Sequence, residues 1–286
     1  MSQEMGSKLG PGGWTLDTIA EVFADLAVEA GAAIMQLYGT DAHMRAKSDK
    51  SPVCDADLAA EAIILKGLAA ALPQFAVVSE EAVAAGARLA ETSTFILVDP
   101  LDGTREFLGR NGEFTVNLAL IIDAVPRAGV VYAPAAGRIW IAGSHAAMAL
   151  VPPGGKLPPS DERQALQVRA APDDGLVALA SRSHADARTE SFLAQLPVKE
   201  RQLAGSSLKF CRIAEAAADV YPRFGPTMEW DTAAGDAVLR SAGGIVRDAE
   251  GRPLRYGKFA DRLTNGPFVA WGDPAAAALH AGAKTA

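Results

Sequence analysis

Two aspartates stand three residues apart in the segment VDPLDGTREF, residues 98–107. They follow TFILV, an apolar and β-branched run typical of a buried strand. Pro100 has no backbone N–H, which predicts that the strand stops at Asp99. A second short strand, FAVVSEE, ends in the same way in the acidic pair Glu80 and Glu81. Carboxylates at strand ends are accessible to water or to a ligand.

These strand ends predict a metal site. Glu80, Asp99 and Asp102 can converge there, and such a concentration of negative charge is unfavourable unless cations neutralise it. Hard oxygen ligands without nearby His or Cys favour Mg²⁺ or Mn²⁺ over zinc. Gly103 permits close approach of the backbone to a ligand, and Thr104 can supply a hydroxyl.

The residues alone leave a plainer interpretation open. PLDG is also typical of a polar surface turn whose aspartates cap a following helix. A third class, the haloacid-dehalogenase phosphatases with their D-x-D-x-T motif and nucleophilic aspartate, is disfavoured because Asp99 and Asp102 are three residues apart.

Composition limits the partners. The chain has 286 residues and a net charge of −7, from 27 basic and 34 acidic residues, which gives no global attraction to a nucleic acid polymer. An anionic substrate must therefore be held locally. Cys54 and Cys211 have neither disulfide-framework nor zinc-site spacing. No signal-peptide pattern or run of about 18 apolar residues occurs, so we expect a cytoplasmic protein without a transmembrane segment.

Periodicity predicts the elements that position these residues. We expect helices over 16–37 and 57–72, and then an antiparallel sheet whose strands include TFILVD, EFTVNLALII and two strands within AGVVYAPAAGRIWIAG. The proline- and glycine-rich segment 151–163 is the candidate boundary. The second half is predicted to be α/β, with strands LVALAS and VYPRF and helices near 185–195, after GSS, and over DTAAGDAVLRSA.

The predicted organisation has three parts. Residues 1–13 form a polar, glycine-rich tail that we expect to be mobile. Residues 14–155 form an N-terminal α+β half that carries most of the candidate metal ligands. Residues 156–286 form a C-terminal α/β half, to which the family resemblance given next assigns the nucleotide-binding residues and the last metal ligand.

Three motifs occur together in a known order. DPLDGT resembles the D-P-[IL]-D-G-T signature of the lithium-sensitive inositol monophosphatase-like phosphatases, with VVSEE upstream and WDTAAGDAVLRSAGG downstream. Within that superfamily, KSDKSPVCDADLAAE, SRSHAD, GSSLKFC and YPRFGPTMEWDTAAGDAV resemble the bacterial 3'(2'),5'-bisphosphate nucleotidases of sulfur assimilation. The resemblance extends from about Leu16 to the C-terminal strands.

The resemblance implies an α/β (α+β) fold, a layered αβαβα sandwich of the inositol monophosphatase and fructose-1,6-bisphosphatase type. It implies hydrolysis of adenosine 3',5'-bisphosphate to AMP and phosphate, and acceptance of 3'-phosphoadenylyl sulfate, without a covalent enzyme intermediate. Two or three Mg²⁺ ions, or Mn²⁺ as a substitute, are implied. The residues implied as metal ligands are Glu80, Asp99, the carbonyl of Leu101, Asp102 and Asp231.

The resemblance also implies roles around the substrate. Asp57 and Thr104 would activate the attacking water, with Glu80 counted among the catalytic residues. Gly103 and Thr104 would offer backbone N–H groups to the phosphate. The residues that match nucleotide-contacting positions are His184, Ser206, Lys209 and Arg223.

Two positions depart from the pattern of these relatives. Cys54 and Asp55 stand where relatives commonly have a threonine and a small residue, just before Asp57. We interpret Asp55 as a solvated charge in the first turn of a helix. The change to Cys54 puts the local hydrogen bonding in doubt.

Other functions remain as hypotheses. An inositol, sugar or histidinol monophosphatase would share the metal ligands and differ at SRSHAD, GSSLKF and YPRFGP. A catalytically weak nucleotide-binding module is disfavoured by the presence of both Asp57 and Thr104. The expected partner is a small-molecule nucleotide, and the state a monomer or homodimer. A peripheral position on the cytoplasmic face of the inner membrane is left open.

Overall fold

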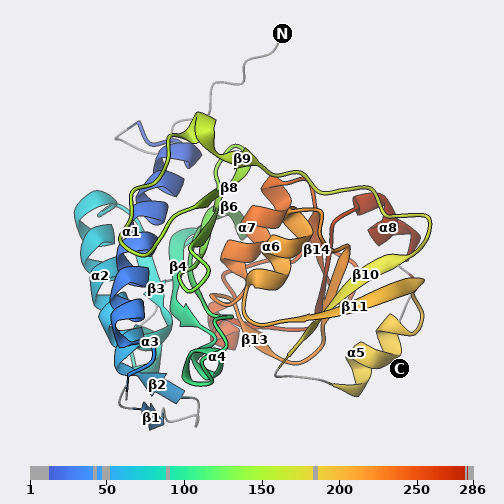
Figure 1. Cartoon of the computed structure of the whole chain (residues 1–286), viewed down its shortest axis with the longest axis horizontal. Coiled ribbons are helices and arrows are strands. Elements are labelled where there is room, and N and C mark those ends of the chain that lie inside the picture. The colour runs from blue at the N-terminus through green and yellow to red at the C-terminus, as the bar shows by residue number, and fades with distance from the viewer. Residues whose placement is uncertain are drawn as a thin grey trace.

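The computed structural model describes residues 13–40, 44–46, 52–87, 91–182, 186–280 and 282. Within these residues two large sheets and the helices around them form five layers, αβαβα (Figure 1). The layered sandwich predicted from the family resemblance is confirmed. The predicted division at residues 13 and 155 stays a proposal.

The first sheet has seven strands in chain order and is antiparallel except for its first pair. Its members are β3 (Ala76–Ser79), β4 (Thr94–Asp102), β5 (Thr115–Ile122), β6 (Val125–Ala133), β7 (Arg138–Ala142), β8 (Ala146–Leu150) and β9 (Gln164–Ala165). Short turns connect β5 to β8, which agrees with the antiparallel sheet expected from the sequence. The parallel pairing of β3 with β4 places the ends of these two strands at the same edge.

The second sheet has the order β11-β10-β12-β16-β14. Its strands are β10 (Leu176–Ser181), β11 (Val198–Ala204), β12 (Val220–Arg223), β14 (Ile245–Asp248) and β16 (Phe268–Trp271). Two small pairs complete the described strands: β1 (Met44–Ala46) with β2 (Pro52–Cys54), and β13 (Thr227–Met228) with β15 (Thr264–Asn265).

Helices occupy three layers (Figure 1). The pair α1 (Leu16–Leu37) and α2 (Asp55–Ala71) covers the outer face of the first sheet. Between the sheets lie α6 (Leu208–Ala214) and α7 (Ala233–Ser241), and beyond the second sheet lie α5 (Ala187–Leu193) and α8 (Pro274–Leu279). The described short helices are α3 (Glu80–Ala84), α4 (Thr104–Leu108) and two 3-10 turns, Ser160–Glu162 and Phe259–Asp261. The helix predicted over 16–37 is confirmed in full, because its apolar residues recur every three or four positions.

Three apolar clusters fill the spaces between the layers. One joins α1 and α2 to the first sheet, and a second surrounds α6 and α7 between the two sheets. The third joins α5 and α8 to the second sheet. Cys211 lies fully buried in the middle cluster, as expected for a core residue. None of the described helices is long and apolar enough to cross a lipid bilayer.

One local prediction is wrong. Strand β4 does not stop at Pro100 but continues to Asp102, because a bulge accommodates the proline instead of ending the pairing. Asp231 lies one residue before Thr232, the N-cap of α7.

The bulge in β4 determines where two carboxylates lie. Asp99 is paired with Asn117 of β5, and Asp102 with Thr115, so β4 has two intervening residues where β5 has one. Residues three apart on a regular strand lie on opposite faces. The extra residue restores the alternation and brings Asp99 and Asp102 to the same face. The spacing of three between the two aspartates is thus compatible with a shared face only because of the bulge.

Helix α7, whose start follows Asp231, packs very closely on the first sheet. A Cβ atom added to Gly129 of β6 would lie 2.8 Å from the Cβ of Ala237 and 3.2 Å from the Cα of Ala234. A side chain at Gly129 would therefore push α7 away from the sheet, and with it the segment that carries Asp231.

We predict that Gly129→Ala lowers the free energy of unfolding by about 1–3 kcal/mol through overpacking. The matched control is Gly266→Ala, where an added Cβ meets no atom within 4 Å. That change should stay within about 0.5 kcal/mol of the parent. Denaturant unfolding measures both variants, and equal stability of the two would contradict the close packing described here.

Candidate metal centre and substrate cavity

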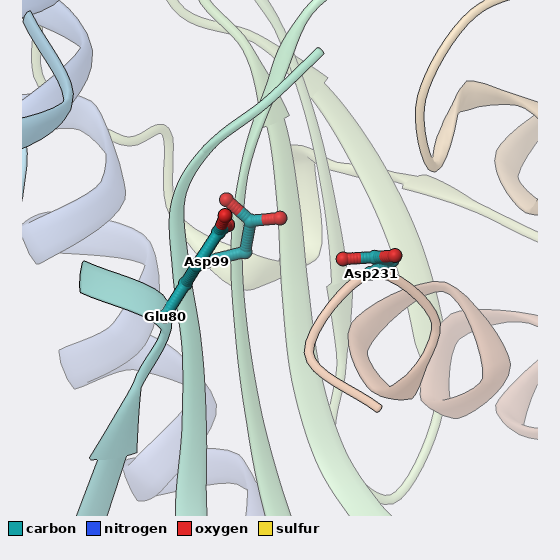
Figure 2. A group of neighbouring side chains, drawn as sticks. All are labelled: Glu80, Asp99 and Asp231. Carbon is teal, nitrogen blue, oxygen red and sulfur yellow. The ribbon is translucent and has the colours of Figure 1, made fainter. Parts of the chain in front are cut away.

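Three carboxylates meet at the edge where the two halves of the molecule face each other. Ligand oxygens of Glu80, Asp99 and Asp231 lie within 4.8 Å of one another. Figure 2 shows Glu80 at the start of α3, Asp99 beside it on β4, and Asp231 facing them from the segment before α7. The first two come from the N-terminal half and the third from the C-terminal half.

Burial and mutual repulsion make this arrangement costly without a cation. Burial is the main cause that raises the pKa of Asp99 well above its usual value, and the charges of Glu80, Asp102 and Asp231 raise it further. The pKa of Asp231 is raised well above its usual value for the same reasons, with burial first and Asp102 and Glu80 next. A divalent ion would remove this repulsion, so the donor set fits a hard cation.

Asp102 lies beside the three carboxylates but is held separately. Its Oδ2 accepts hydrogen bonds from the backbone N–H of Ser207, 2.7 Å away, and from Nδ2 of Asn117, 3.3 Å away. Burial raises the pKa of Asp102 to about 6, while the charge of Lys209 and these hydrogen bonds act against the rise. The donors that reach Asp102 from the described residues gather on Oδ2 and so fix the orientation of the carboxylate.

Asp57 and Thr104, predicted as the water-activating pair, are in direct contact. The hydroxyl of Thr104 donates to Oδ1 of Asp57 at 3.2 Å and lies 3.5 Å from the carbonyl oxygen of Leu101. Asp57 is buried in the first turn of α2, whereas Thr104 begins α4. The starts of two helices thus bring together two residues that are 47 positions apart along the chain.

A cavity of about 260 Å³ opens beside these groups. It brings together residues that the sequence analysis selected separately from both halves of the chain. Those that line it are Glu80, Leu101, Asp102, Gly103, Thr104, Ser206, Lys209, Arg223 and Asp231.

Two buried cations, Lys209 and Arg223, also line this cavity. Nζ of Lys209 donates to the carbonyls of Ser206 (2.7 Å) and Ala204 (3.3 Å) and lies 5.1 Å from the centre of the Tyr221 ring. Burial lowers the pKa of Lys209 to about 8, although the negative charge of Asp102 acts to raise it. Arg223 is 9% exposed, and its Nε has no hydrogen-bond partner among the described residues. A buried guanidinium N–H without an acceptor is suited to an anionic ligand.

Gly103 and Ser206 lie against each other at the wall of the cavity. Gly103 has φ of +95°, and an added Cβ would lie 2.4 Å from Oγ of Ser206. The Ser206 hydroxyl lies 2.8 Å from the carbonyl oxygen of Asp102 and 2.7 Å from that of Glu113. Ser206 therefore links the β4 bulge to the segment that leads into α6.

The sequence analysis singled out two further residues. His184 lies outside the described residues. Asp55 lies half-buried in the first turn of α2, as expected, and does not belong to the group of three carboxylates.

Sequence reasoning missed several residues that hold the site together. Glu61 lies one turn after Asp57 on α2, and its Oε1 accepts hydrogen bonds from the Ser79 hydroxyl and from the N–H of Ala82 (3.0 Å). It thus holds both sides of the turn that carries Glu80. Its spacing of four from Asp57 was an available signal, because such residues share a helix face.

Glu113 and Ser207 form a second group of residues that sequence reasoning missed. Glu113 accepts from the N–H of Gly205 at 2.8 Å and binds Arg182 through two hydrogen bonds of 2.9 Å. Ser207 donates its hydroxyl to the carbonyl of Asp231 at 2.7 Å. These contacts span 24 to 92 residues, and no local pattern in the sequence marks them.

Comparisons with known proteins agree with this geometry. A model of the inositol monophosphatase family matches residues 15–283. The 3'(2'),5'-bisphosphate nucleotidase CysQ of Escherichia coli K12 is 45% identical over 236 residues, which cover 81% of this chain and 91% of that protein. The protein of the same name from Salmonella typhimurium is 44% identical over 241 residues, 82% of this chain and 93% of that one.

Solved structures give the same result. CysQ from Bacteroides thetaiotaomicron, described as a bacterial member of the inositol monophosphatase family, superimposes with a TM-score of 0.75 at 38% identity, covering 90% of this chain and 97% of that one. The inositol monophosphatase of Anabaena has a TM-score of 0.71 at 23% identity, over 93% and 94% of the two chains, which shows a shared fold. The chain therefore belongs to the inositol monophosphatase family.

Proposed function

We propose that the protein is a metal-dependent 3'(2'),5'-bisphosphate nucleotidase that hydrolyses adenosine 3',5'-bisphosphate to AMP and phosphate, and accepts 3'-phosphoadenylyl sulfate as well. The names of its relatives support this activity. The observation that carries it is the lining of one cavity, which combines carboxylates with the buried cations Lys209 and Arg223. A substrate with two phosphates offers one to a metal held by the carboxylates and one to the cations.

The group of carboxylates around the cavity is the proposed metal site. Glu80, Asp99 and Asp231, with Asp102 and the carbonyl of Leu101, would hold two or three Mg²⁺ ions, for which Mn²⁺ is a possible substitute. When bound, such ions lower the pKa of water and neutralise charge on the attacking and leaving oxygens. We count Glu80 among the catalytic residues because it belongs to the group of three carboxylates and lines the cavity.

Asp57 and Thr104 form the proposed path for the proton of the attacking water. Because the Thr104 hydroxyl donates its hydrogen to Asp57, its lone pairs face away from that carboxylate and can accept a hydrogen bond from water. As the water oxygen bonds to phosphorus, its proton passes to Thr104 while the Thr104 proton passes to Asp57. The P–O bond to the ribose then breaks, and its electron pair stays on the ribose oxygen, which takes a proton from solvent. No bond to the protein forms.

The rest of the cavity is proposed to hold the nucleotide. Gly103 and Thr104 would offer backbone N–H groups to the phosphate under attack. Arg223 and Lys209 would neutralise the second phosphate, with Ser206 beside them. His184 is a further proposed nucleotide contact.

A cytoplasmic location and a monomeric or homodimeric state complete the proposal. The small nucleotide is the proposed partner.

The substrate test compares phosphate release from adenosine 3',5'-bisphosphate and from inositol 1-phosphate, each with Mg²⁺ and with EDTA. We expect Mg²⁺-dependent hydrolysis with a clear preference for the nucleotide, because only the nucleotide has a second phosphate that Lys209 and Arg223 can neutralise. A preference for inositol 1-phosphate would retain the metal chemistry and overturn the roles of Lys209 and Arg223. Tight nucleotide binding without phosphate release would indicate a binding module.

Asp99→Asn should have opposite effects on stability without and with metal. Without metal, loss of one buried like charge relieves repulsion, so the variant should unfold at a higher temperature than the parent in EDTA. Saturating Mg²⁺, at about 100 times its Kd, should raise the parent Tm by about 5 °C and leave the variant unchanged. Turnover should be lost.

The Tm of the parent and of Asp99→Asn is measured by thermal unfolding in EDTA and in Mg²⁺. The matched control is Asp174→Asn, an exposed carboxylate paired with Lys199, which should keep the Mg²⁺ response. A variant Asp99→Asn that is still stabilised by Mg²⁺ or still active would contradict the metal site.

Arg223→Gln should remove recognition of the second phosphate. We expect kcat/KM for adenosine 3',5'-bisphosphate to fall about 10- to 100-fold, in line with loss of hydrogen bonds between charged groups. The value for adenosine 3'-monophosphate, which lacks the 5'-phosphate, should change little. Steady-state kinetics on both substrates measures the difference, with Arg252→Gln, an exposed arginine, as the control. An equal loss on both substrates would show that Arg223 does not read the second phosphate.

A further inference from the structure

Cys54 contacts the proposed proton acceptor through two groups. Its backbone N–H donates to Oδ2 of Asp57 at 2.8 Å, and its thiol Sγ lies 2.9 Å from the same oxygen. The thiol is 1% exposed and the Asp57 side chain 2% exposed, so water does not compete for these contacts. Both donors of Cys54 therefore converge on one carboxylate oxygen.

The other oxygen of Asp57 has a different partner. Oδ1 accepts the hydroxyl of Thr104 at 3.2 Å. Since Cys54 holds Oδ2, the carboxylate is fixed about its own axis and presents Oδ1 to Thr104. A carboxylate accepts at both oxygens, and a buried one without its donors is destabilised.

The thiol acts as the donor in this contact. Burial is the main cause that raises the pKa of Cys54 to about 12, and the charge of Asp57 raises it further. The S–H proton is thus retained at neutral pH, and the only acceptor that it reaches among the described residues is Oδ2 of Asp57. A thiolate at this position would repel the carboxylate.

We propose that Cys54 is a positioning residue for the proposed hydrolysis: its thiol and backbone N–H together hold Asp57 so that Oδ1 faces Thr104. This inference rests on the proposed roles of Asp57 and Thr104. Cys54 touches neither the substrate nor the carboxylates at which the metal site is proposed, so it acts only through Asp57.

The kinetic test replaces the thiol in graded steps. Cys54→Ala removes the donor with little loss of volume, and we expect kcat to fall about tenfold with KM for adenosine 3',5'-bisphosphate unchanged. Cys54→Ser and Cys54→Thr restore a donor at the same position and should recover most of kcat. Cys211→Ala, at the other buried cysteine, is the matched control and should leave kcat unchanged.

The spectroscopic test does not depend on activity. The infrared S–H stretching band of Cys54 in the full chain should lie at lower frequency than that of Cys211, because a hydrogen bond to a carboxylate weakens the S–H bond. In Asp57→Asn the band of Cys54 should move toward that of Cys211. This readout remains valid if Cys54→Ala fails to fold or if the protein proves to act on another substrate.

Three results would overturn the inference. The first is an unchanged kcat in Cys54→Ala, and the second is an equal loss in Cys54→Ala and Cys54→Ser. The third is an S–H band of Cys54 that does not respond to Asp57→Asn. A parent protein that is inactive on the nucleotide but shows the expected S–H shift would contradict the proposed function while retaining the contact.

Discussion

Mutual repulsion among buried carboxylates is the constraint on which the rest of this structure depends. Glu80 and Asp99 belong to the first sheet edge and Asp231 to the segment before α7, so the repulsion acts between the two halves of the chain. The fold opposes it with close packing of α7 on β6 and with hydrogen bonds from Ser207 and Asn117 around Asp102. Such an arrangement destabilises the metal-free protein, and proteins retain destabilising features mainly where function requires them.

The backbone of β4 determines where two of these carboxylates lie. A one-residue bulge at Pro100 and Leu101 brings Asp99 and Asp102 to one face, and Gly103 adopts a positive φ immediately afterwards. The chain then enters α4, where Thr104 meets Asp57. One short irregular segment thus connects the carboxylates, the proposed phosphate contacts and the proposed proton path. The cations that complete the cavity come from the second sheet and from α6.

Much of this organisation could be predicted from the sequence because its signals are local. The α1 helix follows from its apolar periodicity, and the place of Glu80 directly after β3 follows from the acidic pair behind a β-branched run. The bulge could not be predicted, because a proline in a strand is compatible with both an end and an irregularity. Glu61, Glu113 and Ser207 were missed because their roles arise from contacts with residues distant in sequence.

The central claim is that Glu80, Asp99 and Asp231 form a metal site beside the proposed substrate cavity. The most direct measurement is an anomalous difference map from crystals of the protein grown with Mn²⁺ and AMP. We predict anomalous peaks between these three carboxylates, with the nucleotide extending toward Lys209 and Arg223. Peaks elsewhere, or carboxylates that bind no metal while the nucleotide is present, would contradict the account.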